Sequence, residues 1–110
     1  MDLNKAMLIG RLTRDPEVKT TPKSGSFTMF SVATSREWVD QKGAKQKLTE
    51  FSNVVVWGKL GEALGKFLKK GKQVYVEGHL QTSDWLGKDG TKRYKTEVVA
   101  ESVIMLGSKE

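Results

Sequence analysis

Cysteine is absent from this 110-residue sequence, and histidine occurs once. A chain without thiols has no disulfide framework, no thiolate metal site and no cysteine nucleophile. A single imidazole also provides few ligands for a metal ion. No apolar run approaches the roughly 20 residues that a membrane span needs. The amino-terminal segment has Asp2 and a short apolar stretch cut by Gly10 and Arg11, which is not the layout of a secretory signal. These absences predict a soluble, cytoplasmic protein without a cofactor or a metal site.

Positive charge, by contrast, is in excess. Lysine and arginine total 19 against 13 acids, which gives a formal net charge of +6. Such an excess is typical of a protein that meets a polyanion, although it also serves solubility alone. The excess is regional, because residues 59–72 hold most of it and residues 96–110 are net acidic. Nucleic acid is therefore one candidate partner.

Short alternating segments separated by turn signals, with no repeat or linker, predict a single domain over residues 1–110. A stripe formed by Leu60, Leu64, Phe67 and Leu68 predicts the only helix, with Gly71 at its C-cap. Aromatic and β-branched residues predict the strands. These cover Lys5–Leu12, Ser26–Ser35, Phe51–Trp57, Gln73–Leu80 and Tyr94–Leu106.

The order of these elements predicts an all-β fold with one helix, the five-stranded OB-fold Greek-key barrel, with the helix between the third and fourth strands. Residues 36–50 are predicted as an extended hairpin around Gly43. OB-folds bind oligonucleotides or oligosaccharides on the face of strands 2 and 3 and on two loops. Those loops are expected within Thr13–Lys23, a turn-rich connection, and Thr82–Lys92.

The third predicted strand is apolar on both faces. Because side chains alternate across a strand, Val54 and Val56 share one face, and Phe51 and Trp57 share the other. The valines supply the core-facing side, so the two rings pack outside the barrel, against another chain, a loop or a ligand. In all, four large aromatics fall in one region outside the predicted core faces: Trp38, Phe51, Trp57 and Trp85.

Cations accompany these rings along the sequence. Bases stack on aromatic side chains while lysines follow the phosphate backbone, so the combination predicts sequence-tolerant binding of single-stranded nucleic acid. A duplex hides its base faces in its own stack and is expected to bind less well. The cations are Arg36, Lys42, Lys45, Lys47, Lys59, Lys88, Lys92 and Arg93.

Five segments of the sequence are DPEVK, ATSREW, TEFSNVVVWGKLGEAL, LKKGKQVYVEGHL and RYKTEVVAESVIMLG. In register and over nearly all of the chain, they resemble the bacterial single-stranded DNA-binding protein family. The resemblance implies an OB-fold without enzymatic activity. It also implies a homotetramer, built as a dimer of dimers, that wraps single-stranded DNA during replication, repair and recombination.

Carried over position by position, the resemblance assigns stacking to Trp38, Phe51, Trp57 and Trp85. It assigns basic contacts to Lys5, Lys19, Lys59 and Lys70, the last two lining the DNA path. Subunit contacts are implied at Gln73, Tyr75, Glu77 and His79. The residues add Met7 and Ile9, since the first strand has apolar side chains on both faces, which implies a second buried surface.

Two other classes of function are weighed against this one. An enzyme is disfavoured, because the acids are scattered and no nucleophile lies beside a base in a known motif. An OB-fold module that binds RNA, an oligosaccharide or a protein partner remains an alternative. The 2′-OH distinguishes RNA from DNA, and no feature of the sequence indicates whether it is recognised. Family members typically continue into a flexible linker and an acidic tip that recruits replication and repair proteins. Such partners are expected here only if a tail exists beyond MLGSKE, whether the chain is a trimmed core or a minimal natural form.

Overall fold

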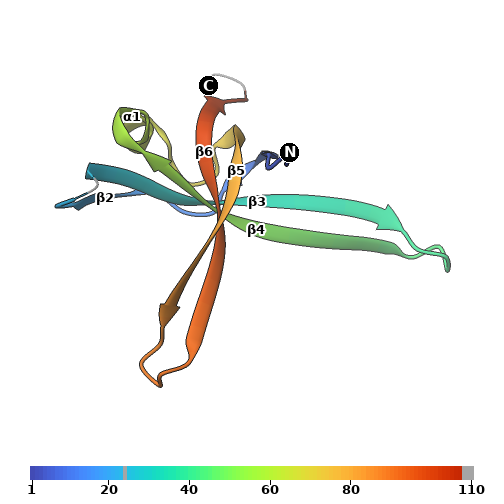
Figure 1. The fold of residues 1–110 in the computed structure, drawn as a ribbon. Helices are drawn as coiled ribbons and strands as arrows, with labels where there is room; N and C mark the ends of the chain where they lie inside the picture. Colours follow the sequence, from blue (N-terminus) through green and yellow to red (C-terminus); the bar gives the residue numbers. More distant parts are fainter. Residues whose placement is uncertain (24, 108–110) are drawn as a thin grey trace.

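A closed barrel forms the body of the molecule in the computed structural model, which describes residues 1–23 and 25–107 (Figure 1). Its strands follow the order β1, β5, β6, β4 and β3, and pairing between β1 and β3 closes it. All pairings are antiparallel except β4 with β6. The predicted OB-fold barrel is confirmed. The strands are β1 (Ala6–Leu12), β3 (Gly25–Val39), β4 (Lys45–Trp57), β5 (Gln73–Leu86) and β6 (Lys92–Met105), and α1 (Gly58–Phe67) joins β4 to β5.

An additional strand, β2 (Glu17–Thr21), lies at the sheet edge and pairs only with β3. The sequence predicted a turn-rich connection here, and that prediction was wrong. Four of its residues are exposed, so the segment has no inward apolar alternation by which it would be recognised. Its strand conformation depends instead on the hydrogen-bonding edge that β3 offers.

The core lies inside the barrel and contains the valines predicted to face inward, Val54 and Val56. Phe30 and Val32 of β3 pack with Val54 and Val56 of β4 in one cluster of buried side chains. The other members of this cluster are Leu12, Leu64, Leu68, Val74, Val76, Val98 and Ala100. Burying apolar side chains contributes roughly 1.5–3 kcal/mol for each large one, which makes this cluster the main source of stability.

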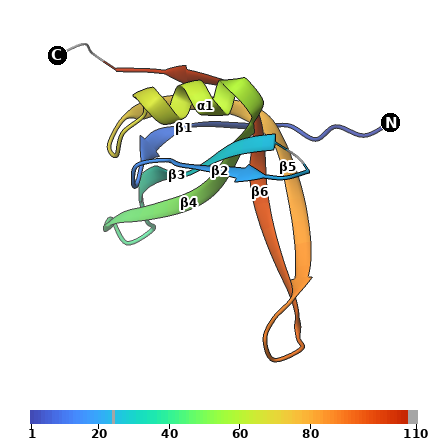
Figure 2. The same ribbon diagram turned by 90° about the vertical axis from the view of Figure 1, so that its left-hand side faces the viewer.

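Helix α1 covers one end of the barrel and packs against β2, β3 and β4 (Figure 2). Its buried residues are Gly61 and Leu64, and Leu68, which is the C-cap in place of the predicted Gly71, is buried as well. The predicted stripe is therefore confirmed at Leu64 and Leu68 and wrong at Leu60 and Phe67, whose side chains are exposed. The reason is Gly61, whose missing side chain lets the helix approach the backbone of Val56 closely. The helix is thereby rotated from the orientation that apolar spacing alone suggested.

Two hairpins extend beyond the barrel as arms and leave it in different directions (Figure 1). The β3–β4 arm confirms the predicted extended hairpin, since β3 and β4 stay paired out to Val39 and Lys45. The β5–β6 arm continues to Leu86 and Lys92, so most of the predicted Thr82–Lys92 loop is strand. A register shift at Gly78 marks where β5 leaves the barrel, and a side chain there would clash with the carbonyl of Val99.

Candidate nucleic-acid interface

A continuous row of side chains crosses the outer face of the sheet. Lys19 of β2 pairs with Phe27 of β3, which pairs with Trp57 of β4. In the next row, Val55 of β4 pairs with Val99 of β6. Residues that face one another across neighbouring strands share a face, so these rows form one surface between the edge strand and the β5–β6 arm.

The aromatic rings predicted to stack on bases are exposed as the sequence indicated. The exposed fractions are 41% for Trp38, 66% for Phe51, 44% for Trp57 and 46% for Trp85. Trp57 is supported from one side by Phe27, with ring centroids 4.8 Å apart and planes tilted by 41°. Phe27 is a candidate site residue that was not predicted, although it lies within the predicted strand Ser26–Ser35.

A cavity of about 360 Å³ opens beside this pair of rings. Phe27, Met29, Val55, Trp57 and Val99 supply its apolar lining. Lys19, Gln81, Ser83, Lys95 and Glu97 supply its polar lining. The volume lies at the low end of the roughly 300–1,000 Å³ found for small-ligand sites. A planar group with one apolar face and one polar edge fits this division.

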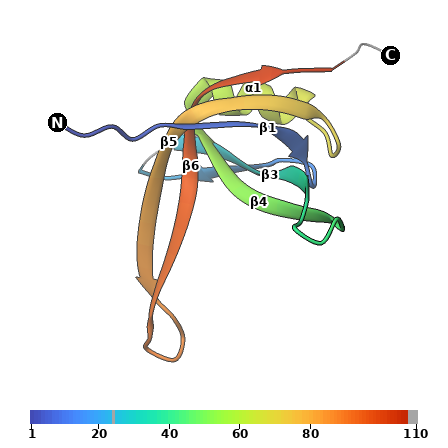
Figure 3. The same ribbon diagram turned by 90° about the vertical axis from the view of Figure 1, so that its right-hand side faces the viewer.

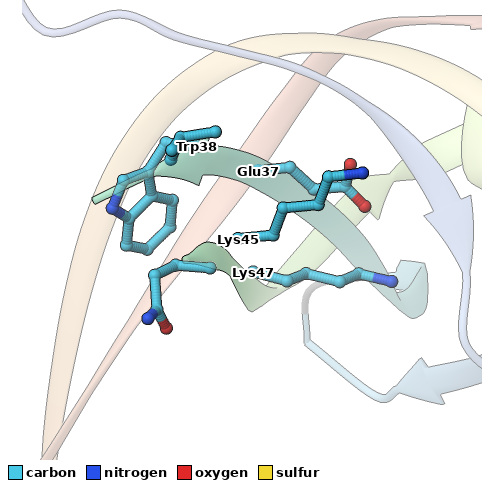
Figure 4. Close-up of a pocket in the computed structure, with 6 residues that line it drawn as sticks. Glu37, Trp38, Lys45 and Lys47 are labelled. Atoms are coloured by element: carbon cyan, nitrogen blue, oxygen red, sulfur yellow. The ribbon is translucent and has the colours of Figure 1, made fainter. Parts of the chain in front are cut away.

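The β3–β4 arm presents different aromatics on its two faces. Trp38 faces Gln46 across the arm, and Glu37 faces Lys47, so Trp38 and Lys47 lie on opposite faces. Figure 4 shows the indole ring of Trp38 and the ends of Lys45 and Lys47 extending to different sides of the ribbon. By the same alternation, Phe51 lies on the face opposite Trp38. The expectation of four rings in one region therefore fails within one chain.

The turn of this arm is fixed by Asp40. Its carboxylate accepts hydrogen bonds from the backbone N–H groups of Lys42 and Ala44 and from the side-chain amide of Gln46. The amide of Gln46, followed by these backbone donors, lowers the pKa of Asp40. A turn closed in this way fixes the backbone at the tip of the arm before any ligand arrives.

The β5–β6 arm also has an aromatic on each face. Trp85 pairs with Arg93, whereas Tyr94 lies on the other face and has Lys92 over its ring at 5.9 Å. On the first arm, Arg36 lies 5.1 Å from the ring centroid of Trp38 in the same way. Cations stacked on exposed rings place positive charge next to surfaces on which bases can stack. Tyr94 was not among the predicted stacking residues.

Ion pairs divide the predicted cations into two groups. Four are paired with acids: Lys5 with Glu77, Lys19 with Glu17, Lys92 with Asp84 and Arg93 with Asp89. Within the part of the chain that the structure describes, the side chains of the others form no ion pair: Arg36, Lys42, Lys45, Lys47, Lys59, Lys70 and Lys88. Lys95, which lines the cavity, was not predicted; it lies on the same face of β6 as Glu97, with which it is paired.

The outer face of β1 and β5 is a separate surface (Figure 3). Met7 and Ile9 are 62% and 56% exposed, and Ile9 lies opposite Tyr75. The Tyr75 hydroxyl donates to Glu77 at 2.6 Å, and Lys5 donates to the same carboxylate at 3.0 Å. Lys5 therefore lies on this apolar face and not beside the cavity. The remaining predicted interface residues join it here, with Gln73 opposite Arg11 and His79 3.7 Å from Glu101.

Two further features bear on the class of function. Among residues 1–23 and 25–107, no group of three His, Asp or Glu side chains lies close enough to hold a metal ion. In the same residues, no helix is long and apolar enough to cross a membrane.

Comparison with known proteins identifies relatives of this chain. The sequence profile of the single-strand binding protein family matches residues 3–106. A single-stranded DNA-binding protein of Neisseria meningitidis is 46% identical over 109 residues, covering 99% of this chain and 63% of that protein. Single-stranded DNA-binding protein 1 of Chlorobaculum tepidum is 47% identical, covering 98% and 67%. The chain thus spans less than two thirds of the Neisseria relative.

Solved structures give the same picture. A Plasmodium falciparum SSB in complex with ssDNA superposes with a TM-score of 0.88 at 31% identity, covering 97% of both chains. A deletion mutant of the single-stranded DNA binding protein from Thermus aquaticus gives a TM-score of 0.84 at 31% identity, covering 97% of this chain and 52% of that one.

Proposed function

This chain belongs to the single-strand binding protein family, and from that premise we propose that it binds single-stranded DNA without strong sequence preference. The observation that carries the proposal is the outward row of Phe27 and Trp57 beside an open cavity, with Lys19 and Lys95 on the cavity lining. Stacked bases gain contact with the rings, and lysines neutralise phosphates. Each ring contributes roughly 1–3 kcal/mol per base in such sites.

The two arms extend this surface. Phe51 continues the outer face of β4 away from the barrel, and Trp85 continues the outer face of β5. Trp38 lies on the back of its arm with Arg36 stacked on it. A DNA strand that contacts all four rings must therefore pass from one face of the β3–β4 arm to the other. A flexible single strand can follow such a path, and a stiff duplex cannot.

The protein acts on DNA as a homotetramer, a dimer of dimers, in this proposal. The exposed apolar face with Met7 and Ile9 supports it, since a lone chain leaves this face in water. Its work is protection of single strands in replication, repair and recombination, in the cytoplasm on the nucleoid.

The test is a tryptophan fluorescence titration with oligothymidylate at rising salt, repeated with duplex competitor and with oligouridylate. Quenching that resists duplex is expected, with log K falling against log salt at about 0.7 per phosphate contact. A signal without salt dependence would point to a sugar or protein ligand. Stronger binding of oligouridylate would make the chain an RNA-binding module.

A further inference from the structure

A carboxylate lies where a surface for DNA would be expected to carry only cations. The side chain of Glu97 is 13% exposed and lines the cavity beside Trp57. Among the residues that the structure describes, its one charged partner is Lys95, whose Nζ lies 3.5 Å from Oε2. An acid in this position repels phosphate, so a DNA strand in the cavity must place something else next to it.

The cavity offers the two kinds of surface that a nucleobase has. Trp57, supported by Phe27, provides a flat apolar surface, and Val55 and Val99 add to the apolar lining. Glu97 and its neighbours on β5 and β6 provide the polar side. A base that stacks on Trp57 with its polar edge toward β6 would bring that edge to the carboxylate.

The polar side is built on paired strands and not on a loop. Gln81 of β5 pairs with Glu97 of β6, and Ser83 pairs with Lys95. Parallel pairing of Val55 with Val99 fixes β6 against β4, the strand that holds Trp57. Groups held by paired strands keep their positions more closely than groups on loops, as selective hydrogen bonding requires.

We propose that this cavity is a base-reading subsite, in which Glu97 accepts a hydrogen bond from the exocyclic amino group of a base stacked on Trp57. The inference rests on the proposed binding of single-stranded DNA. A carboxylate pairs with the amino group at N4 of cytosine. Thymine presents an acceptor oxygen, O4, at the same place, and two acceptors repel each other. Cytosine is therefore favoured over thymine at this one position, within otherwise sequence-tolerant binding.

The experiment compares fluorescein-labelled oligodeoxycytidylate and oligothymidylate of equal length by anisotropy, with the wild-type chain and with Glu97→Gln. Glutamine has the same shape, but its amide donates to thymine O4 as well as accepting from cytosine. Glu62→Gln, on the exposed side of α1, removes the same charge elsewhere and serves as the control. Intrinsic differences between the two oligonucleotides cancel, because the quantity compared is the ratio of their association constants between proteins.

The cytosine-to-thymine ratio is expected to fall by roughly fivefold or more in Glu97→Gln and to stay unchanged in Glu62→Gln. An equal gain in affinity for both oligonucleotides would show that Glu97 only repels the backbone, which overturns the proposal. Failure of the wild-type chain to bind either one would instead refute DNA binding itself. If Glu97→Gln does not fold, oligomers of N4,N4-dimethylcytosine, which lack the amino donor, are used with the wild-type chain. Affinity equal to that for cytosine would then overturn the proposal.

Discussion

Trp57 packs against Phe27, its cross-strand partner, with 4.8 Å between ring centroids. The contact fixes one face of the indole and leaves the side toward the cavity open. A ring held in this way loses less conformational freedom when a base stacks on it than a free ring would. Phe27 is thus a positioning residue for the proposed interface.

Phe27→Ala is expected to weaken oligothymidylate binding, because Trp57 then loses its support. The loss should be smaller than for Trp57→Ala, since the stacking ring itself remains. Anisotropy titration measures the affinity, and Phe27→Leu, which keeps an apolar contact, is expected to recover part of it. Equal affinity in wild type and Phe27→Ala would mean that Trp57 needs no support.

Trp57→Ala is expected to weaken binding by roughly 1–3 kcal/mol while the protein stays folded. The ring is partly exposed and is not part of the buried cluster. Circular dichroism and thermal unfolding check the fold, and titration with oligothymidylate checks the affinity. The control is Phe67→Ala on α1, an exposed aromatic outside the proposed interface. Unfolding of Trp57→Ala alone would assign the ring a structural role.

The barrel was predictable because its strands alternate around one core. Val54 and Val56 on β4 are fully buried, as their alternation with Phe51 and Trp57 indicated, and Val74 and Val76 on β5 alternate and are fully buried in the same way. Strand β2 was not predictable, since its residues are mostly exposed and only its pairing with β3 makes it a strand. Hydrophobic periodicity arises where one face of a strand is buried, and an edge strand such as β2 buries few side chains.

The residues of the candidate site were likewise predictable only where a local pattern fixes their position. Phe51 and Trp57 were assigned to the outer face correctly, because both lie on one continuous strand, whose alternation fixes their parity. Trp38 was placed with them wrongly, since which face it takes depends on the register of the whole β3–β4 arm. The sequence did not indicate Glu97 as a site residue. Its position beside Trp57 depends on the parallel pairing of β6 with β4, which no local sequence pattern predicts.

Lys59→Ala is expected to lower the affinity for oligothymidylate and to make the salt dependence shallower, by about 0.7 in the slope of log K against log salt. Lys59 lies in the first turn of α1, two residues after Trp57, and its side chain forms no ion pair among the described residues. Titrations at several salt concentrations give the slope. Lys66→Ala, in the last turn of the same helix, is the control. An unchanged slope would remove Lys59 from the phosphate path.

Acid is expected to destabilise the protein partly through Glu77. A hydrogen bond from Tyr75, followed by the hydrogen bond and charge of Lys5, lowers the pKa of this carboxyl below its ordinary value of 4.5. A depressed pKa stabilises the folded state above the ordinary value, and this contribution is lost as the pH falls through the folded-state pKa. Between about pH 6 and about pH 3, the thermal midpoint of Glu77→Gln should therefore fall less than that of wild type. An identical fall would contradict this role, and Glu62→Gln controls for charge.

Ile9→Asp is expected to reduce the size of the assembly without unfolding the chain. The side chain is already exposed on β1, so a carboxylate there costs little in a single chain. Between two apolar faces it would be buried without a partner, which is strongly unfavourable. Light scattering after size-exclusion chromatography measures the mass, and Val39→Asp, at the end of β3 near the turn of the β3–β4 arm, is the matched control. If Ile9→Asp keeps the wild-type mass, the face of Met7 and Ile9 is not the contact between subunits.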